Sequence, residues 1–560
     1  MSVRAGFGFS EIFCGFACGI YDRPLAMLSR HALNAQSSRL RIHGTAPVSH
    51  KEIEVKLALA PATLFALKKI PLFRTVKATP KRASQVSVYF DTDTHKLRQK
   101  GLMLRVRREG RRYTQTIKSN TNSGLFQRDE WETEIAGKKP DLNQVNGTVP
   151  GPLLGKKLRR RLKPLFETRV RRTVYPLVDH ERAIALAVDR GTIDTGTRSQ
   201  RLCEIEIELE RGTPAVLFDV ARELTLALPA RLAVKSKSER GYELINGGQD
   251  LPVNAAPVDL PAGTIARDAF KMIGLACLEQ VINNEAALIK GDPEGVHQMR
   301  VGLRRLRAAM SLFSALLRDP QTEAIKTELK WLAGELGPAR ELEVLLNRVV
   351  APMKKRGRRW RGMPLLSQEF AERRDAALTC ARDAVQSPRF RVLTVDIAAW
   401  LQTGVWTSPQ DDLIHEQGNL PIEMFASKQL ARRWRKIRKR GRVLGKLDAR
   451  GRHELRIQTK KLRYAAEFFA TLFTTKRAVK RRKQFLSALE RLQDGLGDLN
   501  DISVHAKRIA AMGIRHRRAK PSRVFAAGLL TGREDARMEA AMITTTDAYA
   551  ELVKVKPFWR

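Results

Sequence analysis

Charged residues alternate with aliphatic ones along residues 50–57, which read His-Lys-Glu-Ile-Glu-Val-Lys-Leu. Because successive side chains of a β-strand point to opposite faces, such a strand carries Glu52, Glu54 and Lys56 on one face and aliphatic residues on the other. Two carboxylates and an ammonium group that face the same way are suited to a wet, ion-filled cavity. The alternative is an ordinary amphipathic strand with a solvated face.

Later segments of the chain repeat this alternation. Arg105 and Arg107 share one face of a candidate strand at 102–109. The candidate strand at 201–210 places Glu204, Glu206, Glu208 and Glu210 on one face. Other charged residues on candidate strands or near their ends are Lys118, Arg128, Glu130, Glu132, Glu134, Lys235, Lys237 and Arg240.

Acidic and basic rows in one barrel cannot all face an apolar interior, because burying an unpaired charge is costly. A lumen that holds divalent cations and a polyphosphate satisfies both rows. Glutamates supply the hard oxygen ligands of Mg²⁺ or Mn²⁺, and arginines and lysines bind phosphate oxygens. A metal ion then polarises the terminal phosphate while a carboxylate or another metal-held oxygen orients water for in-line attack. The alternative is pairing of Glu with Arg across an exposed sheet face.

The elements that must position these residues are mostly strands between about 50 and 245. Candidate strands are 51–59, 84–90, 102–109, 112–118, 127–136, 166–177, 184–189 and 201–210. Turns are predicted at 108–110 and 189–191, and first-turn prolines predict short helices at 61–70 and 214–230. Eight strands with hairpin-length connections predict an antiparallel barrel.

After a linker rich in Gly, Pro and Ala at 246–263, the periodicity becomes helical. This half contains an internal repeat. Residues 297–307 read His-Gln-Met-Arg-Val-Gly-Leu-Arg-Arg-Leu-Arg, and residues 453–463 read His-Glu-Leu-Arg-Ile-Gln-Thr-Lys-Lys-Leu-Arg. A Leu-Gly pair follows each copy, at 336 and 496. We therefore predict two related helical bundles packed about a pseudo-two-fold axis.

The predicted organisation is α+β. An N-terminal eight-stranded antiparallel β tunnel or barrel with flanking helices is followed by an all-α helical-bundle domain with an internal two-fold repeat. The expected limits are a disordered extension at 1–48, the barrel domain at 49–247, a linker at 248–262 and the helical domain at 263–555.

The 560 residues carry a formal net charge of +43, from 102 Lys and Arg against 59 Asp and Glu. This surplus indicates a polyanionic partner: nucleic acid, an anionic membrane or another form of phosphate. Only 6% of the residues are aromatic, which disfavours binding of single-stranded nucleic acid by base stacking. The five cysteines are scattered, so we expect reduced thiols in the cytoplasm. No apolar run is long enough to cross a bilayer, and no membrane partner is expected.

Residues about 49–245 resemble the CYTH domain, the family of triphosphate tunnel metalloenzymes. The resemblance rests on an ordered set of motifs: Glu52-x-Glu54-x-Lys56, Tyr89-Phe-Asp91-Thr, Leu97-x-x-x-Gly101-Leu-x-Leu-Arg105-x-Arg107, Lys118, Glu204-x-Glu206-x-Glu208 and Ser236-Lys237-x-x-Arg240-Gly-Tyr242. The family implies an eight-stranded tunnel that binds triphosphate groups with a divalent metal, for which we expect Mg²⁺ or Mn²⁺.

The resemblance also implies roles for residues at the matching positions. Metal-side carboxylates are Glu52, Glu54, Glu206 and Glu208, with Glu204 as a further candidate, and the catalytic set adds Lys56. Phosphate ligands are Lys56, Arg105, Arg107, Lys118, Arg128, Lys235, Lys237 and Arg240. Around 166–172 two registers stay open, because strand parity pairs Arg169 with Arg171 whereas the spacing of the family favours Arg172.

In the helical repeat, basic residues and one histidine are spaced to form a single stripe of a helix. The two stripes are His297, Arg300, Arg304 and Arg307, and His453, Arg456, Lys460 and Arg463. Like charges along a stripe repel each other, so two copies favour an anionic ligand over a solvated basic face.

Residues about 263–555 resemble the CHAD domain, the conserved histidine α-helical domain, which implies a polyphosphate-binding module. In the second copy Lys460 and Lys461 replace arginines, which keeps the charge but loses the bidentate fork. The histidines are either phosphate donors or structural residues.

The leading hypothesis is an enzyme, an inorganic triphosphatase that hydrolyses tripolyphosphate to pyrophosphate and phosphate, while the helical domain binds long-chain polyphosphate. One alternative is a non-catalytic protein that binds polyphosphate and targets the chain to granules. Another is a hydrolase or cyclase that acts on nucleoside or thiamine triphosphate. Nucleic acid is the competing partner for the basic surface, but not the expected one. We expect a cytoplasmic protein associated with polyphosphate granules.

Overall fold

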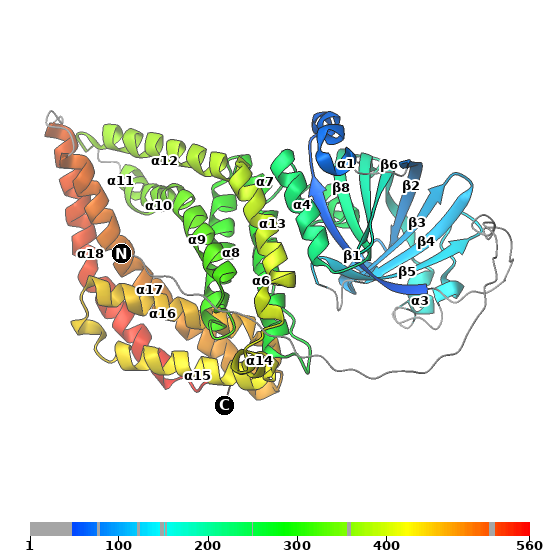
Figure 1. The fold of residues 1–560 in the computed structure, drawn as a ribbon. Helices are drawn as coiled ribbons and strands as arrows, with labels where there is room; N and C mark the ends of the chain where they lie inside the picture. The colour runs from blue at the N-terminus through cyan, green and yellow to red at the C-terminus, as the bar shows by residue number, and fades with distance from the viewer. Residues whose placement is uncertain are drawn as a thin grey trace, which may run out of the picture. The chain divides into compact units, whose positions relative to one another are not determined.

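The computed structural model describes residues 48–74, 79–119, 124–145, 151, 154–248, 250–355, 360–514 and 521–559 (Figure 1). The extension predicted at 1–48 lies outside these residues, except for Val48. Strands occupy the part of the chain coloured blue to green in Figure 1, and helices dominate from green to red.

Eight strands, β1 to β8, form a closed antiparallel barrel, as the sequence predicts. They are β1 Val48–Ala58, β2 Lys81–Asp91, β3 Leu102–Glu109, β4 Arg112–Ser119, β5 Gln127–Ile135, β6 Lys163–Val178, β7 Ala183–Asp194 and β8 Ser199–Arg211. The order is β5-β4-β3-β2-β6-β7-β8-β1, and pairing of β1 with β5 closes the ring. A short strand that the sequence did not indicate, β9 Arg231–Ala233, also pairs with β1.

The turn predicted at 189–191 is wrong, because β7 continues through these residues to Asp194. Asp189 pairs in register with Arg172 of β6 and with Glu204 of β8. Gly191 does not form a turn but lets β6 and β7 approach closely. A Cβ atom added at this position would lie 1.9 Å from the carbonyl oxygen of Arg169. The reversal of the chain follows instead at Thr195–Arg198, where the Thr195 N–H donates to the Arg198 carbonyl.

The apolar core of this half lies outside the barrel wall. Val55 and Leu57 of β1 are fully buried in a cluster that also contains residues of helix α4 Ala215–Ala227. Phe218 of α4 packs edge-on against Phe126, with ring centroids 5.3 Å apart. Because the aliphatic face of β1 packs outward, its charged face must point into the barrel.

Short helices flank the barrel. They are η1 Pro61–Lys69, α1 Pro71–Arg74, α2 Lys96–Gln99, η2 Leu142–Val145, α3 Lys156–Arg159 and α5 Lys237–Ile245. The helices predicted at 61–70 and 214–230 are present as η1, a 3₁₀-helix, and α4. Helix α5 was not predicted. Its N-cap is Ser236, and the reciprocal hydrogen bonds of a capping box join Ser236 and Glu239.

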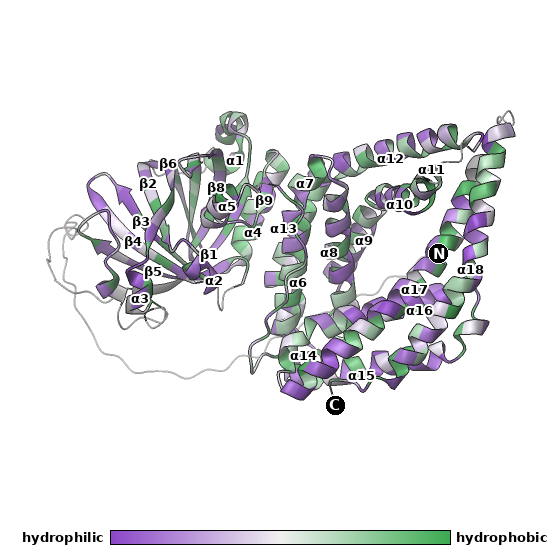
Figure 2. Ribbon diagram, turned by 180° about the vertical axis from the view of Figure 1, so that it is seen from behind, coloured by the Kyte–Doolittle hydropathy of each residue, from purple (hydrophilic) through white to green (hydrophobic). Residues whose placement is uncertain are grey.

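From Ala266 onward the described chain is helical. The elements are α6 Ala266–Asn283, α7 Glu285–Ile289, α8 Pro293–Leu312, α9 Pro320–Glu335, α10 Gly337–Leu345, η4 Leu346–Val350, α11 Ala351–Lys355, α12 Met363–Gln386, α13 Pro388–Thr403, η5 Val405–Thr407, α14 Asp412–Asn419, α15 Ile422–Gly441, η6 Leu444–Lys446, α16 Ala449–Phe468, η7 Ala470–Leu472, α17 Lys476–Ile514 and α18 Pro521–Lys554. Hydrophilic and hydrophobic residues alternate along the long helices (Figure 2), as expected of amphipathic packing. Among the described residues, every helix is too short or too polar to cross a bilayer.

The two copies of the repeat occupy similar helices. Copy one lies on α8 and copy two on α16, each 20 residues long. An aspartate caps each N-terminus: Asp292 accepts from the N–H of Glu294, and Asp448 accepts from the N–H of Gly451. The pseudo-two-fold axis itself stays a prediction.

Candidate functional site

A cavity of about 230 Å³ lies inside the barrel, and charged side chains of both signs line it. The carboxylates come from β1, β5, β8 and α5: Glu52, Glu54, Glu130, Glu132, Glu206, Glu208 and Glu239. The cations come from β1, α2, β3, β4, β5, β6 and α5: Lys56, Arg98, Arg105, Arg107, Lys118, Arg128, Arg172 and Lys237. Since both signs are present on many strands, the cavity is lined for ions rather than for an apolar ligand.

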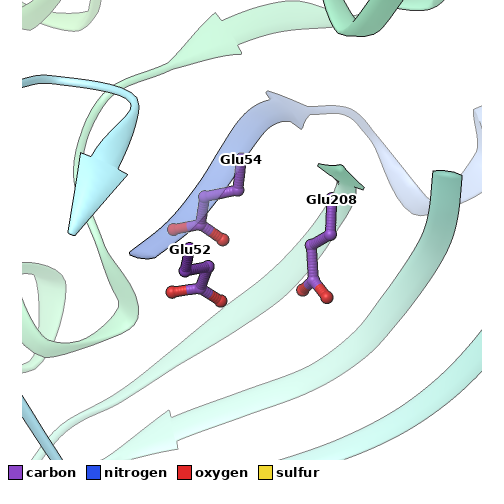
Figure 3. A group of neighbouring side chains, drawn as sticks. All are labelled: Glu52, Glu54 and Glu208. Atoms are coloured by element: carbon purple, nitrogen blue, oxygen red, sulfur yellow. The ribbon is translucent and has the colours of Figure 1, made fainter. Parts of the chain in front are cut away.

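One group of carboxylates gathers where β1 and β8 face each other. Glu52, Glu54 and Glu208 point toward the same space (Figure 3), and each offers an oxygen within 4.8 Å of the others. Burial, together with Glu206, Glu52 and Glu54, raises the pKa of Glu208 to about 7. A divalent cation fits this donor set, because hard oxygen ligands are what Mg²⁺ and Mn²⁺ prefer and the crowded charges need one.

Two lysines already contact this acidic group, which we call the β1–β8 carboxylate cluster. Lys56 Nζ lies 2.5 Å from Glu54 Oε1 and 3.4 Å from Glu206 Oε1. Burial would lower the pKa of Lys56, but Glu54 and Glu206 raise it above its ordinary value. Lys118 donates a hydrogen bond to Glu52. Each of these lysines therefore neutralises one edge of the cluster.

Arg107 lacks the internal partners that Arg105 and Lys118 have. Arg105 Nη2 lies 3.5 Å from Glu130 Oε1, and Lys118 Nζ lies 3.1 Å from Glu130 Oε2. Within the described part of the chain Arg107 forms no ion pair, and its buried Nε has no hydrogen-bond partner. Burial and the nearby guanidinium groups of Arg105 and Arg172 lower the pKa of Arg107. This cation is available to an anionic ligand.

A second carboxylate group, the β7–β8 cluster, consists of Asp189, Glu204 and Glu206. Lys237 lies among them, and these three carboxylates raise its pKa well above the ordinary value although burial alone would lower it. Arg172 Nη2 lies 2.7 Å from Asp189 Oδ2 and also contacts Glu206. Burial would raise the pKa of Glu206, but the nearby Lys237, Lys56 and Arg172 hold it well below its ordinary value.

The structure separates the sequence-predicted residues into two groups. Eleven of them line the cavity: Glu52, Glu54, Lys56, Arg105, Arg107, Lys118, Arg128, Arg172, Glu206, Glu208 and Lys237. Of the two registers left open for β6, the one with Arg172 facing the cavity is present, next to Thr168 and Val170. Arg169 and Arg171 are exposed on the other face of that strand.

Three further residues of the predicted set lie outside the cavity. Lys235 Nζ is paired with Glu243, 2.7 Å away. Arg240 Nη1 lies 3.3 Å from Glu204 Oε2. Glu204 itself is only 1% exposed and sits between Arg240 and Lys237. Arg240 lies on helix α5, which the sequence did not reveal, and Lys235 lies just before that helix.

Sequence reasoning missed Asp189, whose Asp-Arg-Gly context resembles a turn. It also left Glu130 and Glu132 outside the candidate site, although strand parity already placed them on the same face as Arg128. The motif residues Asp91 and Tyr242 have a structural role. Asp91 accepts hydrogen bonds from Leu97 N and Tyr242 Oη, both 2.8 Å, and so holds α2 and α5 to the end of β2.

In the helical half, side chains from both copies of the repeat influence one another. Arg456 and Lys460 on α16 both have a lowered pKa. Burial is the largest cause, and Arg304 on α8 lowers both values further. The pKa of Lys460 falls to about 7. Burial and Arg340 of α10 lower the pKa of His297 to about 4, so this imidazole is neutral at pH 7. We call Arg300, Arg304, Arg340, Arg456 and Lys460 the helical basic cluster.

The remaining residues of the two stripes lie elsewhere. Arg307 is exposed. Arg463 Nε is paired with Glu467 at 2.8 Å. His453 is exposed, and its Nδ1 lies 2.8 Å from Asn500 Oδ1. Arg340, absent from the predicted set, belongs to the Leu-Gly segment that follows the first copy, so that segment was the signal available in the sequence.

Two domain families match the chain: the CYTH domain matches residues 50–242 and the CHAD domain matches residues 273–510. An inorganic triphosphatase of Haemophilus influenzae is 31% identical over 197 residues, which make up 35% of this chain and 55% of that protein. The chain thus spans about half the length of this relative.

Solved structures are similar to separate parts of the chain. The CHAD domain of the plant Ricinus communis is 29% identical, with 55% of this chain and 98% of that one covered and a TM-score of 0.47. A putative adenylyl cyclase from Hippeastrum with a dominant triphosphatase activity is 20% identical, with 36% and 98% covered and a TM-score of 0.27. With the barrel and the helical fold described above, the family matches show that this chain joins a CYTH domain, residues 50–242, to a CHAD domain, residues 273–510.

Proposed function

We propose that the barrel hydrolyses inorganic triphosphate to pyrophosphate and orthophosphate with a divalent cation, and that the helical half binds long-chain polyphosphate. The observation that carries the proposal is the cavity, where carboxylates and phosphate-binding cations from separate strands line one closed space. The CYTH match and the relative named as an inorganic triphosphatase support the reaction class.

The cation, Mg²⁺ or Mn²⁺, would be held by Glu52, Glu54 and Glu208. When bound there it would polarise a phosphoryl oxygen and neutralise charge on the phosphate chain. Arg105, Arg107, Lys118, Arg128 and Arg172 would bind the other phosphate oxygens, and the guanidinium groups can do so with two parallel hydrogen bonds.

Hydrolysis forms a bond between a water oxygen and the terminal phosphorus and breaks the bond from that phosphorus to the bridging oxygen. The terminal group leaves as orthophosphate and the remainder as pyrophosphate. The side chains described above supply positioning and charge stabilisation, which dominate catalysis of phosphoryl transfer. The barrel wall restricts the access of bulk water and strengthens these interactions.

The aromatic residues of the cavity favour an inorganic substrate over a nucleotide. Only Tyr89 and Tyr242 contribute rings to the described lining. Tyr89 stacks on Phe166 with centroids 4.6 Å apart, and Tyr242 packs edge-on against the same ring. Because both tyrosines are also at most 4% exposed, neither offers a free platform on which a nucleobase could stack.

For the helical half, the supporting observation is the helical basic cluster. Burial and the nearby Arg304 lower the pKa of the other four members, and the Nε atoms of Arg304 and Arg456 are buried without hydrogen-bond partners in the described residues. A chain of phosphates would relieve this repulsion and satisfy these donors.

The test is phosphate release from tripolyphosphate, ATP and thiamine triphosphate with Mg²⁺, Mn²⁺ or a chelator. We expect tripolyphosphate to be preferred and the chelator to abolish release. Glu54→Gln should lower kcat/KM by about 100-fold or more, since it removes a candidate metal ligand. Glu134→Gln, at an exposed position of β5, is the matched control. No release from any substrate would reject the enzyme in favour of a binding protein, and a preference for ATP would reject the inorganic substrate.

A further inference from the structure

The β7–β8 cluster contains an ammonium group where a metal ion would have to lie. Lys237 Nζ is 2.6 Å from Glu204 Oε1, 2.8 Å from Glu206 Oε1 and 2.8 Å from Asp189 Oδ2. The three carboxylates are at most 5% exposed. The Lys237 ammonium group donates a hydrogen bond to Glu206 Oε1 and forms ion pairs with the other two carboxylates.

The charges of this cluster balance without a metal. Asp189, Glu204 and Glu206 contribute three negative charges. Lys237, Arg172 and Arg240 contribute three positive ones through direct contacts with these carboxylates, and Lys56 adds a further contact at 3.4 Å from Glu206 Oε1. A divalent cation in this cluster would need the same three carboxylate oxygens that now contact the Lys237 ammonium group. It could bind only if that ammonium group moved away.

The β1–β8 cluster differs in this respect. Each lysine contacts one carboxylate of this cluster, Lys118 at Glu52 and Lys56 at Glu54, and its other partner lies outside the cluster. Among the described residues Glu208 forms an ion pair only with Arg172, at 3.7 Å. Oxygens of these three carboxylates lie within 4.8 Å of one another, and among the described residues no single ammonium group forms ion pairs with all three.

We propose that in the substrate-free protein Lys237 occupies the position of a second divalent cation, so that the barrel binds one metal ion, at the β1–β8 cluster, instead of two. This inference rests on the proposed function for the first metal. Lys237 is then a positioning residue. It holds Glu206, which also lies 3.4 Å from Lys56 and through it adjoins Glu54.

Equilibrium dialysis of the full chain against Mn²⁺ without substrate tests the proposal by counting ions. Wild type should bind one Mn²⁺ in the barrel. Lys237→Met, which removes the ammonium group but keeps most of the side-chain length, should bind two. Lys237→Arg should still bind one because it keeps the positive charge. Lys235→Met is the matched control, since this neighbouring lysine pairs with Glu243 outside the cavity.

Binding of two ions by wild type, or of one ion by folded Lys237→Met, would overturn the proposal. Should Lys237→Met fold only when Mn²⁺ is present, the metal dependence of its circular dichroism supports the same conclusion. Asp189→Asn provides an independent measurement of the number of Mn²⁺ ions bound per chain. This variant should bind as many ions as wild type, and loss of an ion would show that the β7–β8 cluster holds metal. If wild type binds no ion, the proposed metal at the β1–β8 cluster fails; Lys237→Met must then gain one ion for the role of Lys237 to survive.

Discussion

At the scale of single residues, most cationic side chains of the cavity form ion pairs with its carboxylates, but Arg107 does not among the described residues. Arg105 and Lys118 share Glu130, whereas Arg107 has no ion pair among the described residues. An ion-paired side chain must give up a partner before it can bind a phosphate, but Arg107 gains one. Arg107 should therefore contribute more to substrate affinity than its paired neighbours.

Arg107→Ala should lower kcat/KM for tripolyphosphate by about 10- to 150-fold, since a hydrogen bond to a charged group contributes about 1.5–3 kcal/mol. Arg169→Ala is the control, because Arg169 is exposed on β6 and pairs with Glu167; its kcat/KM should stay within about twofold of wild type. Steady-state kinetics at constant ionic strength would check both. Equal losses in the two variants would contradict the proposed role of Arg107.

The pKa of Lys460 predicts that polyphosphate binding depends on pH. Burial and the nearby Arg456 and Arg304 depress this pKa to about 7, so the amine is charged below pH 7 and loses its proton above it. A bound polyanion favours the charged form, hence affinity should be full below pH 7 and fall by up to about tenfold per unit as pH rises from 7 to 9.

Calorimetric titration of long-chain polyphosphate into the Glu54→Gln chain, which blocks hydrolysis, would measure this dependence. Lys460→Arg keeps its charge throughout, so its affinity should change little over the same range. A wild-type affinity that is independent of pH would contradict the prediction.

Strand parity predicted most of the cavity-facing residues, because a period of two leaves little freedom once one face packs in a core. Parity alone could not choose between Arg169 and Arg172, whose orientation depends on the register of β6. It also could not show that Lys237 meets carboxylates rather than phosphate. That contact depends on closure of the barrel, which brings β7, β8 and α5 together.

At the scale of elements, the eight strands followed from alternation and turn residues, and the helical half followed from its periodicity. The strand order did not, because β2 pairs with β6 and β1 pairs with both β8 and β5. The errors have local causes. Asp189-Arg190-Gly191 has the composition of a turn, yet Gly191 permits the close approach of β6 and β7. Helix α5 was not predicted, because its nine residues are too few for a clear helical periodicity. The capping box formed by Ser236 and Glu239 was the available signal.

Gly191→Ala should destabilise the barrel by about 1–3 kcal/mol, since the added methyl group collides with the backbone at Arg169 and forces the strands apart. Gly137→Ala is the control, because a Cβ atom there meets nothing within 4 Å. Denaturant unfolding followed by circular dichroism would compare the two, and equal midpoints would show that β6 and β7 tolerate the methyl group.

At the scale of the whole molecule, the two halves carry separate ion-binding clusters, in the barrel and on α8, α10 and α16. If each half performs its own part of the proposed function, substitutions in one should leave the other intact. Glu54→Gln should lower kcat/KM for tripolyphosphate by about 100-fold or more without changing the affinity for long-chain polyphosphate. The double variant Arg304→Ala, Arg456→Ala should weaken that affinity at least about tenfold but leave hydrolysis of tripolyphosphate within about twofold.

These two measurements on full-length variants, at matched salt because exposed charges are screened, would distinguish independent halves from a shared substrate path. A loss of tripolyphosphate hydrolysis in the double arginine variant would contradict independence.

The internal ion pairs of the cavity also determine which anions the barrel ignores. A lone sulfate or chloride ion can pair with Arg107, but to reach the other cations it must break contacts such as Lys118 with Glu52, which leaves a carboxylate without compensation. Under the proposed function, a metal–polyphosphate chelate would exchange partners on both sides at once: its cation would go to the glutamates and its oxygens to the lysines and arginines. The barrel can therefore discriminate against simple salts even though the chain as a whole is strongly basic.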